Sequence, residues 1–267
     1  MTSTAPRDLN GFTDLAAGMR AWRTWALLAI EDYRVRYHRT LIGPLWVAIS
    51  FAAFVGVKIF IFSFAMSRDL QYYSVYLCAG FLVWMFIVQV FSEGCTTFLA
   101  AKSWILGIPA PYSLFLYQGM LRNIVSYLVT LIVALIIVYT VRPVPLPYVA
   151  VSFLSFLLLI FLMFWVQLFL AVLSVRIRDV VQLVNVFMRI MFFLTPILWI
   201  PSAVSAGARA FAQYNPFTHL LAIIREPLLG SMPTAVNWYV YLGLLAISII
   251  SSLGLYSLEY RRLAARL

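Results

Sequence analysis

Four polar side chains recur at helical spacing within an apolar run in the second half of the chain. They are Asp179, Gln182, Asn185 and Arg189, three, three and four residues apart. Such spacing places them on one face of a helix, with Arg189 about 14 Å along it. If the run crosses a membrane, a charged group at that depth normally faces protein or water, because exposure to lipid costs several kcal/mol. The stripe predicts either the lining of a polar conduit or a buried ion pair that locks helix packing, and the residues alone leave both open.

Two further sets of side chains could bind or position a ligand. Glu93 and Arg122 lie at neighbouring ends of two apolar runs, and we expect a structural salt bridge between them. Three tyrosines, Tyr72, Tyr73 and Tyr76, stand at the start of one run. Tyrosine and tryptophan at a membrane surface usually form an interfacial belt, although their flat faces also stack on sugar rings. Aromatic density alone favours the belt.

The residue types that catalysis requires are scarce. No Gly-x-x-x-x-Gly-Lys-[Ser/Thr] loop surrounds Lys58 or Lys102, so the chain does not bind ATP by a phosphate-binding loop of that kind. The histidines, His38 and His219, and two cysteines give no metal-ligand spacing. We therefore expect no cofactor and no metal in this chain. A membrane-embedded enzyme is a poorly supported hypothesis.

The composition identifies the class of protein. The chain has 267 residues, of which 64% are hydrophobic and only 10% charged, and its mean hydropathy is +0.97. Soluble domains carry about 25% charged residues, so the charges here are too few to cover a water-facing surface. Disordered, coiled-coil, collagen-like and nucleic-acid-binding classes are excluded. The composition predicts an all-α polytopic membrane protein with no nucleic acid partner.

Six apolar runs are long enough to cross a bilayer as helices of about 20 residues. They lie at about 41–66, 72–93, 112–140, 148–175, 180–200 and 236–258. The third run is longer than one span needs, and we expect it to cross from about Gly119. The fifth is short and is interrupted by Pro196. The sequence predicts six transmembrane helices.

The cations indicate how these spans are oriented. With the N-terminus inside, the cytoplasmic side receives thirteen: Arg7, Arg20, Arg23, Arg34, Arg36, Arg39, Lys102, Arg122, Arg176, Arg178, Arg261, Arg262 and Arg266. The opposite side receives only four: Arg68, Arg142, Arg209 and Arg225. Because short cytoplasmic loops are enriched in Lys and Arg, both termini are predicted to be cytoplasmic. An even number of spans agrees with this.

Three segments are neither ordinary spans nor ordinary loops. Residues 13–37 place apolar side chains at steps of three and four, which predicts one amphipathic helix in the cytoplasmic interface. Residues 94–111 predict a helix such as 96–106, followed by a break at Gly107–Pro111. Residues 201–235 contain several prolines, and we expect a pair of short re-entrant helices there, tolerated because protein covers the broken backbone.

Several short motifs resemble those of one known family, the ABC-2-type membrane subunits that export polysaccharides such as O-antigen, capsule and teichoic acid. They are Arg-Tyr-His-Arg-Thr-Leu-Ile-Gly-Pro-Leu-Trp at 36–46, Arg-Ile-Arg-Asp-Val at 176–180, Thr-Pro-Ile at 195–197, and Asn215-Pro216 followed by Arg225. Their order matches that of the family from about residue 15 to the C-terminus. One departure is the loop at 103–109, which reads Ser-Trp-Ile-Leu-Gly-Ile-Pro where the family commonly has Asn-x-x-Leu-Ile-x-x-x-x-Phe-Pro.

The resemblance implies a homodimer that forms a channel, with each subunit docked on a separate nucleotide-binding ATPase that carries the ATP and Mg²⁺. On this hypothesis residues 13–37 are the interface helix, 94–111 the coupling loop and 201–230 the periplasmic gate. It also makes stacking of a glycan on channel aromatics about as well supported as a membrane belt.

Three groups of residues are therefore the candidates for function. Those of the substrate channel are Trp46, Lys58, Tyr72, Tyr73, Tyr76, Gln182, Asn185, Arg189 and Phe192. Those of ATPase coupling are Thr97, Ala101, Lys102, Trp104, Leu106, Arg176, Arg178 and Asp179. Those of the periplasmic gate are Asn215, Pro216 and Arg225.

The leading hypothesis is a channel-forming subunit of an ATP-driven exporter in the bacterial inner membrane. It would move a lipid-linked, O-antigen-like polysaccharide from cytoplasm to periplasm, in contact with membrane lipids. The chain would divide into a cytoplasmic N-terminus (1–40), a transmembrane domain (41–258) and a cytoplasmic tail (259–267). The alternatives are an exporter of a small lipid or drug from the same superfamily and, third, a membrane enzyme acting on lipid-linked sugars.

Overall fold

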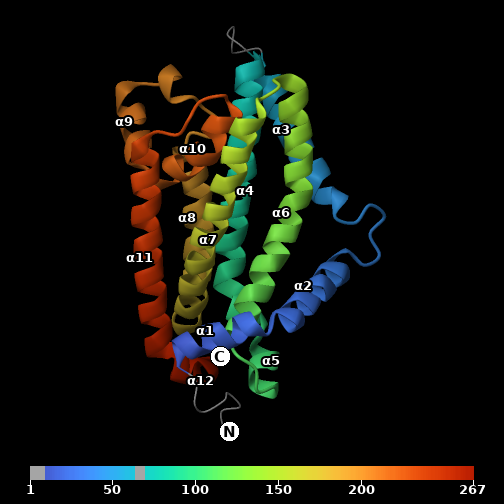
Figure 1. The fold of residues 1–267 in the computed structure, drawn as a ribbon, viewed down its shortest axis with the longest axis vertical. Helices are drawn as coiled ribbons and strands as arrows, with labels where there is room; N and C mark the ends of the chain where they lie inside the picture. Colours follow the sequence, from blue (N-terminus) through green and yellow to red (C-terminus); the bar gives the residue numbers. More distant parts are fainter. Residues whose placement is uncertain (1–9, 64–69) are drawn as a thin grey trace.

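The computed structural model describes residues 10–63 and 70–267, and all regular structure in them is helical. In chain order the helices are α1 (Gly11–Arg20), α2 (Trp22–Tyr37), α3 (Leu45–Ser63), α4 (Leu70–Ala100), α5 (Lys102–Gly107), α6 (Ser113–Val141), α7 (Leu146–Arg176), α8 (Val180–Leu194), η1 (Pro201–Ala203), α9 (Ala206–Tyr214), α10 (Pro216–Leu228), α11 (Ala235–Glu259), η2 (Tyr260–Arg262) and α12 (Leu263–Arg266). Figure 1 shows them as one elongated bundle. The prediction of an all-α chain is confirmed for these residues.

Within the described residues, four helical segments are long and apolar enough to cross a membrane. They are Leu70–Gly107, Ser113–Val141, Leu146–Arg176 and Ala235–Arg266. Two shorter apolar helices, Leu45–Ile61 and Val180–Leu194, fall in the first and fifth predicted runs. The chain is an integral membrane protein by these criteria, whereas six spans stay a prediction. The end of the first run, 64–66, and the cations Arg7 and Arg68 lie outside the described residues.

Helix α4 forms the centre of the bundle. It contacts α3, α6, α7, α8 and α10, and consecutive side chains from Tyr73 to Ala79 are all buried. Burial on every side means that this stretch of α4 has no face left for lipid. Both cysteines, Cys78 and Cys95, are buried on this helix with free thiols.

The bundle has two distinct ends (Figure 1). Helices α1, α5 and α12 lie at one end, which we call the α5 end, and α9 and α10 lie at the other, the α10 end. The first and last described helices thus share an end, as an even number of crossings requires. Which end faces the cytoplasm stays a prediction.

The expectation of one amphipathic helix over 13–37 is wrong, because two helices, α1 and α2, meet at Ala21. Helix α1 packs closely against the start of α6 at Gly18, where a Cβ atom would lie 2.1 Å from the hydroxyl oxygen of Ser113. The buried face of α1 also includes Asp14. A pattern of apolar residues does not predict this position, because aspartate is not apolar. Met19, an apolar residue of the same helix, is exposed.

The expected helix at 96–106 is also wrong. Helix α4 continues through Gly94 to Ala100. The glycine allows α7 to pack closely there, because a Cβ atom would lie 3.3 Å from the Cα of Gln167. Within the predicted coupling segment, the separate helix is therefore α5 alone, six residues long, and its coupling role stays a prediction. The predicted break after Gly107 is present.

The predicted tail at 259–267 is packed against the bundle. Leu263 and Leu267 are buried with α5 and α7 residues in a cluster at the α5 end. Glu259 accepts from Arg176 at 3.3 Å, and its other carboxylate oxygen forms an ion pair with Arg266 at 3.0 Å. These contacts tie the last described residues to the end of α7.

At the α10 end, the segment predicted to be a gate forms η1, α9 and α10. Pro216 occupies the first turn of α10, and the side-chain oxygen of Asn215 accepts from the backbone N–H of Phe217 at 3.0 Å, which caps the helix. Helix α10 packs against α4, α7 and α11. It is therefore covered by protein, and its placement as a re-entrant element stays a prediction.

Candidate functional site

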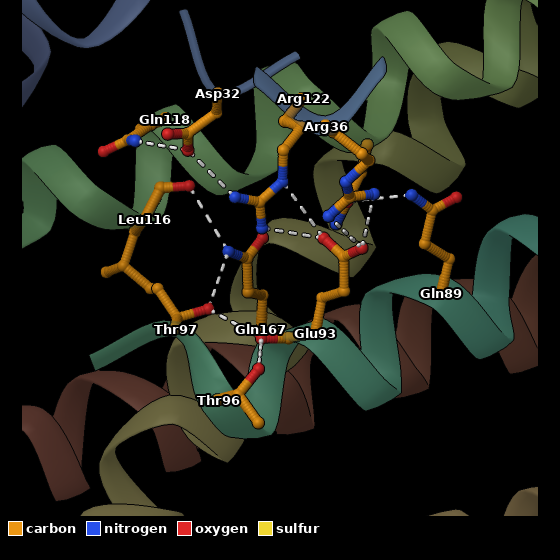
Figure 2. Close-up of polar contacts among 11 residues, drawn as sticks. Asp32, Arg36, Gln89, Glu93, Thr96, Thr97, Leu116, Gln118, Arg122 and Gln167 are labelled. Atoms are coloured by element: carbon orange, nitrogen blue, oxygen red, sulfur yellow. Dashed lines mark hydrogen bonds and ion pairs between the residues drawn. The ribbon is translucent and has the colours of Figure 1, made fainter. Parts of the chain in front are cut away.

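A cluster of charged side chains joins α2, α4 and α6 near the α5 end (Figure 2). Its members, here called the charged cluster, are Asp32, Arg36, Glu93 and Arg122. Arg122 donates to Glu93 at 2.8 Å and to Asp32 at 3.0 Å, and Arg36 donates to the other oxygen of Glu93 at 3.2 Å. The predicted Glu93–Arg122 pair is confirmed, and the other two members were not predicted.

The charged cluster is electrically balanced, with two cations and two carboxylates. Its side chains are 21–40% exposed, so solvent screens each pair and no single one is strong. Because Glu93 bridges two arginines and Arg122 bridges two carboxylates, the pairs support one another. The arrangement holds α2 against α4 and α6.

A cavity of about 470 Å³ lies beside the charged cluster, between α2, α4, α5 and α6. Three of the predicted coupling residues, Thr97, Ala101 and Trp104, line it. The Thr97 hydroxyl donates to the Glu93 carbonyl at 3.0 Å and accepts from Gln167 at 3.3 Å (Figure 2). This wall of the cavity is therefore fixed by polar contacts inside the bundle.

The other predicted coupling residues differ in how accessible they are to a partner protein. Ala101 is buried at 7% exposure and lines the cavity, so its side chain offers little surface to a partner protein, and its part in coupling stays a prediction. Trp104 and Leu106 are exposed on α5, as is Lys102. Their placement leaves one face of this short helix open at the end of the bundle.

The end of α7 and the loop after it supply the remaining coupling candidates. Arg176, Arg178 and Asp179 are all exposed. Of these, Arg176 already pairs with Glu259. Asp179 directly precedes α8 without a side-chain capping bond.

A groove of about 670 Å³ lies between α3, α4 and α8. Its lining includes three of the predicted channel residues, Asn185, Arg189 and Phe192. Ser92 of α4 donates to Asn185 at 2.9 Å, which orients that amide. The polar stripe therefore borders a groove, with Gln182 exposed one turn before Asn185 on the same helix.

Aromatic rings form one wall of this groove, here called the aromatic wall: Phe54, Phe81, Trp84 and Phe192. Phe54 and Phe81 stack with centroids 4.1 Å apart, and Trp84 lies 6.1 Å from Phe192. Only Phe192 was predicted. In a chain that is 16% aromatic, nothing in the sequence separates wall residues from other apolar ones.

Two predicted channel residues on α3, Trp46 and Lys58, lie outside the lining of the groove. The Lys58 ammonium stands 5.4 Å from the centre of the Phe54 ring, and Trp46 is exposed at the start of α3. Arg189 has no ion-pair partner among the described residues and is itself exposed. Since it borders the groove, the interpretation of the stripe as an intrachain ion pair is not supported within residues 10–63 and 70–267.

Tyr73 and Tyr76 do not line the groove, and their assignment to a channel stays a prediction that their burial does not support. Both are buried, at 1% and 3% exposure. Tyr73 donates its hydroxyl to the Leu198 carbonyl at 3.0 Å and Tyr76 to that of Pro196 at 2.8 Å, so they hold the loop after α8. Tyr72 is half-buried, with its ring 6.2 Å from that of Tyr76, and it does not line the groove.

The predicted gate residue Arg225 fastens the same loop from α10. Its guanidinium is 5% exposed, lies 3.9 Å from the centre of the Tyr76 ring and donates to the Pro196 carbonyl at 2.6 Å. Asn215 donates to the Thr195 hydroxyl at 3.0 Å. The motif residues around 195 and 215–225 are thus brought together, although they are far apart in sequence.

A second polar network lies behind Arg225. His219 contacts the Gln213 carbonyl through Nε2 and Asn237 through Nδ1, both at 2.8 Å, and Asn237 lies 3.5 Å from Glu226. A carbonyl only accepts, so Nε2 carries a hydrogen. Burial raises the pKa of the Glu226 carboxyl, against the lowering effects of Arg225, Asn237 and His219.

The groove has a lining that could bind a ligand. Among the described residues, no group of three or more His, Cys, Asp or Glu side chains could hold a metal ion. What the groove offers is flat apolar rings beside an amide, a hydroxyl and a guanidinium. Such a lining fits a ligand with both apolar faces and hydrogen-bonding groups.

No family model matches the chain. Two curated proteins from Klebsiella pneumoniae, both named O-antigen export system permease protein RfbA, are similar to it. One is 24% identical over 234 residues, covering 84% of this chain and 86% of the relative; the other is 24% identical over 203 residues, covering 73% and 76%. At the level of the family, these relatives confirm the resemblance to ABC-2-type polysaccharide-export permeases.

Proposed function

We propose that this relative of the O-antigen export permeases is the channel-forming transmembrane subunit of an ATP-driven exporter. It would move a lipid-linked polysaccharide out of the cytoplasm, with a second copy of itself and a separate ATPase as partners. The relatives' own name describes export of O-antigen. The aromatic wall beside Asn185 and Arg189 is the observation in this chain that best supports the proposal.

The lining of the groove suits a sugar polymer better than a small apolar molecule. Aromatic faces such as that of Phe192 stack on the flat side of a sugar ring. Asn185 supplies an amide and Arg189 up to five N–H donors for hydroxyl groups. A path for a small lipid or drug would be narrower and more purely apolar.

The length of the helices supports six spans. Helix α3 has 19 residues, about 28 Å at 1.5 Å per residue, which is close to the ~30 Å hydrocarbon core. Helix α8 has 15 residues, about 22 Å, and the loop fastened by Tyr73 and Tyr76 follows it. With both short helices counted, the chain crosses six times and both ends are cytoplasmic.

The groove supports assembly with a second copy. It opens between α3 and α8, where Val186, Ile190 and Phe193 are exposed beside the polar Arg189. A charged side chain is tolerated inside a membrane only where protein or water covers it. Two copies packed across α3 and α8 would enclose the grooves and provide that cover.

The α5 end supports docking of an ATPase. The chain contains no phosphate-binding loop of its own, and α5 presents Lys102, Trp104 and Leu106 to the outside. An exposed tryptophan beside a leucine is a suitable anchor in a protein interface. The ATP and Mg²⁺ would be held by the partner.

The proposal is tested by depleting this protein in the cells that naturally produce it. Lipid-linked polymer should accumulate on the cytoplasmic face, and restoring the wild-type chain should clear it. If polymer still reaches the outer surface while a smaller lipid is retained, the alternative of a lipid or drug exporter is favoured. If neither is retained, the chain is not an exporter of this kind.

A further inference from the structure

Asp14 is a fully buried carboxylate, with 0% of its surface exposed. It accepts hydrogen bonds from the backbone N–H groups of Tyr112 and Ser113 at 3.0 and 2.9 Å. It also accepts from the hydroxyls of Tyr256 and Tyr260 at 2.6 and 3.1 Å. No ion pair to Asp14 occurs among the described residues, so these four donors are what hold it.

The donors come from two parts of the chain far from α1. Tyr112 and Ser113 lie at the N-terminus of α6. Tyr256 lies in the last turn of α11, and Tyr260 directly follows that helix. The Ser113 hydroxyl also donates to the backbone carbonyl of Asp14 at 2.7 Å. One carboxylate therefore joins α1, α6 and α11 at the α5 end, where Figure 1 shows these helices meeting.

A carboxylate fits this position better than any neutral side chain of similar size. Its two oxygens can accept all four hydrogen bonds. The first N–H groups of α6 carry the partial positive charge of a helix N-terminus, which favours an anion. An asparagine would direct its NH₂ group at some of these four donors. Those donors would lose their acceptor and would lie against another donor.

The same carboxylate controls how the coupling helix is held. Only residues 108–111 separate α5 from Tyr112, so fixing the N–H groups of Tyr112 and Ser113 fixes the exit of α5. Ile105 of α5 is buried in the same cluster as Leu15, Tyr112 and Tyr260. The orientation of α5 is thus set by the joint around Asp14.

We propose that Asp14 is a positioning residue for coupling, through which α5 is tied to α1, α6 and α11 so that these helices move together when an ATPase moves α5. The proposal rests on the proposed function, because it assumes that α5 docks on the ATPase. Asp14 itself touches neither ATP nor the transported molecule. Its role is to hold α5 in a fixed position relative to α1, α6 and α11.

Two tyrosine variants on one helix test the positioning. Tyr256→Phe removes the hydroxyl that donates to Asp14 at 2.6 Å, and Tyr241→Phe removes one that donates to the Leu158 carbonyl at 2.9 Å. Both tyrosines are buried, so each variant loses one buried hydrogen bond. Amide hydrogen exchange is measured on the full chain in lipid nanodiscs. Tyr256→Phe should speed exchange across 108–113 about tenfold, and Tyr241→Phe should not.

Asp14→Asn gives a stronger version of the same test. Its matched control is Glu31→Gln, because Glu31 forms only an exposed pair with Arg34 at 2.9 Å. Asp14→Asn should loosen 108–113 more than Tyr256→Phe does. If Asp14→Asn does not accumulate in the membrane, the two tyrosine variants decide. Equal exchange across 108–113 in Tyr256→Phe and Tyr241→Phe would overturn the proposal.

The coupling role is tested by a separate measurement, which a change in stability alone would not alter. In the complex with the ATPase, Tyr256→Phe should lower the amount of polymer exported per ATP hydrolysed, and Tyr241→Phe should leave that ratio unchanged at a similar loss of thermal stability. An equal ratio in both variants would refute the coupling role. If no ATPase binds the wild-type chain, the proposed function fails, whereas the exchange data still decide whether Asp14 holds the segment.

Discussion

The guanidinium of Arg225 lies 3.9 Å from the centre of the Tyr76 ring, and both side chains donate to the carbonyl oxygen of Pro196. The two residues come from α10 and α4, and the carbonyl from the loop after α8. A buried guanidinium is stabilised here by an aromatic face and a backbone acceptor. This contact fixes the loop that ends α8 at the α10 end of the bundle.

Replacing Arg225 with lysine should therefore destabilise the chain. An ammonium keeps the charge but cannot both cover the Tyr76 ring and reach the Pro196 carbonyl as a planar fork does. We expect Arg225→Lys to cost about 1–2 kcal/mol of unfolding free energy, measured by thermal unfolding in detergent. Arg209→Lys is the control, since Arg209 is exposed and donates to the Pro201 carbonyl. Similar melting temperatures for both variants would contradict the prediction.

Arg189→Leu should separate transport from stability. Arg189 borders the groove and is exposed, so its loss should change the unfolding free energy by less than about 0.5 kcal/mol. Export, or ATP hydrolysis stimulated by substrate, should fall because the groove loses a donor for hydroxyl groups. A matched loss of yield and melting temperature would instead identify a packing role. Wild-type export with unchanged stability would show that the side chain serves neither purpose.

Phe192→Leu tests the aromatic wall. The substitution keeps an apolar side chain but removes the flat face, so export should fall about two- to tenfold, as expected for the loss of one stacking contact. Phe187→Leu is the matched control, because Phe187 lies on the same helix and does not line the groove. Export rates are compared at equal amounts of protein in the membrane. If the two variants export equally, stacking on Phe192 plays no part.

Glu93→Gln should weaken the attachment of α2. Arg36 loses its ionic partner and Arg122 keeps only Asp32, and we expect a cost of about 1–3 kcal/mol in unfolding free energy. Glu31→Gln removes a carboxylate from an exposed pair on α2 itself and should cost about 0.5 kcal/mol or less. Limited proteolysis within α2 should speed up only in the first variant. Unchanged cleavage there would mean that apolar contacts hold α2.

Leu106→Cys should be captured by an ATPase. Leu106 is exposed on α5, whereas Ala101 is buried at 7% exposure, so Ala101→Cys serves as the control and should react far less with a cysteine on a partner. With a cysteine on the docking surface of the ATPase, disulfide formation should occur only with Leu106→Cys. If an impermeant thiol reagent labels the Leu106→Cys variant freely in the assembled complex, the docking surface lies elsewhere.

The sequence was sufficient for contacts between residues that each carry a local signal. Glu93 and Arg122 have opposite charges at neighbouring ends of two apolar runs, and the pair is present. The stripe from Gln182 to Arg189 follows helical spacing, and its last members do border a groove. Periodicity and charge placement both act within one element, so they can be recognised before the fold is known.

The sequence was not sufficient where tertiary packing decides the role of a side chain. Tyr73 and Tyr76 look like interfacial residues, yet their hydroxyls bond to a backbone more than a hundred residues away. Asp14 lies in a segment of apolar periodicity and has donors at 112, 113, 256 and 260. The aromatic wall combines rings from three helices, and no local pattern marks them.

The joint around Asp14 also determines an order of events during biosynthesis. Tyr256 and Tyr260 follow Asp14 by 242 and 246 positions, and a ribosome delivers the chain from its N-terminus. Helix α1 is thus made well before α11, and its carboxylate gains the Tyr256 and Tyr260 hydroxyls only after α11 has been synthesised. Until then Asp14 has two of its four donors, the N–H groups of Tyr112 and Ser113. If α5 docks on an ATPase as proposed, a nascent chain would complete the joint behind that helix only after α11 is made, which would delay assembly with the partner.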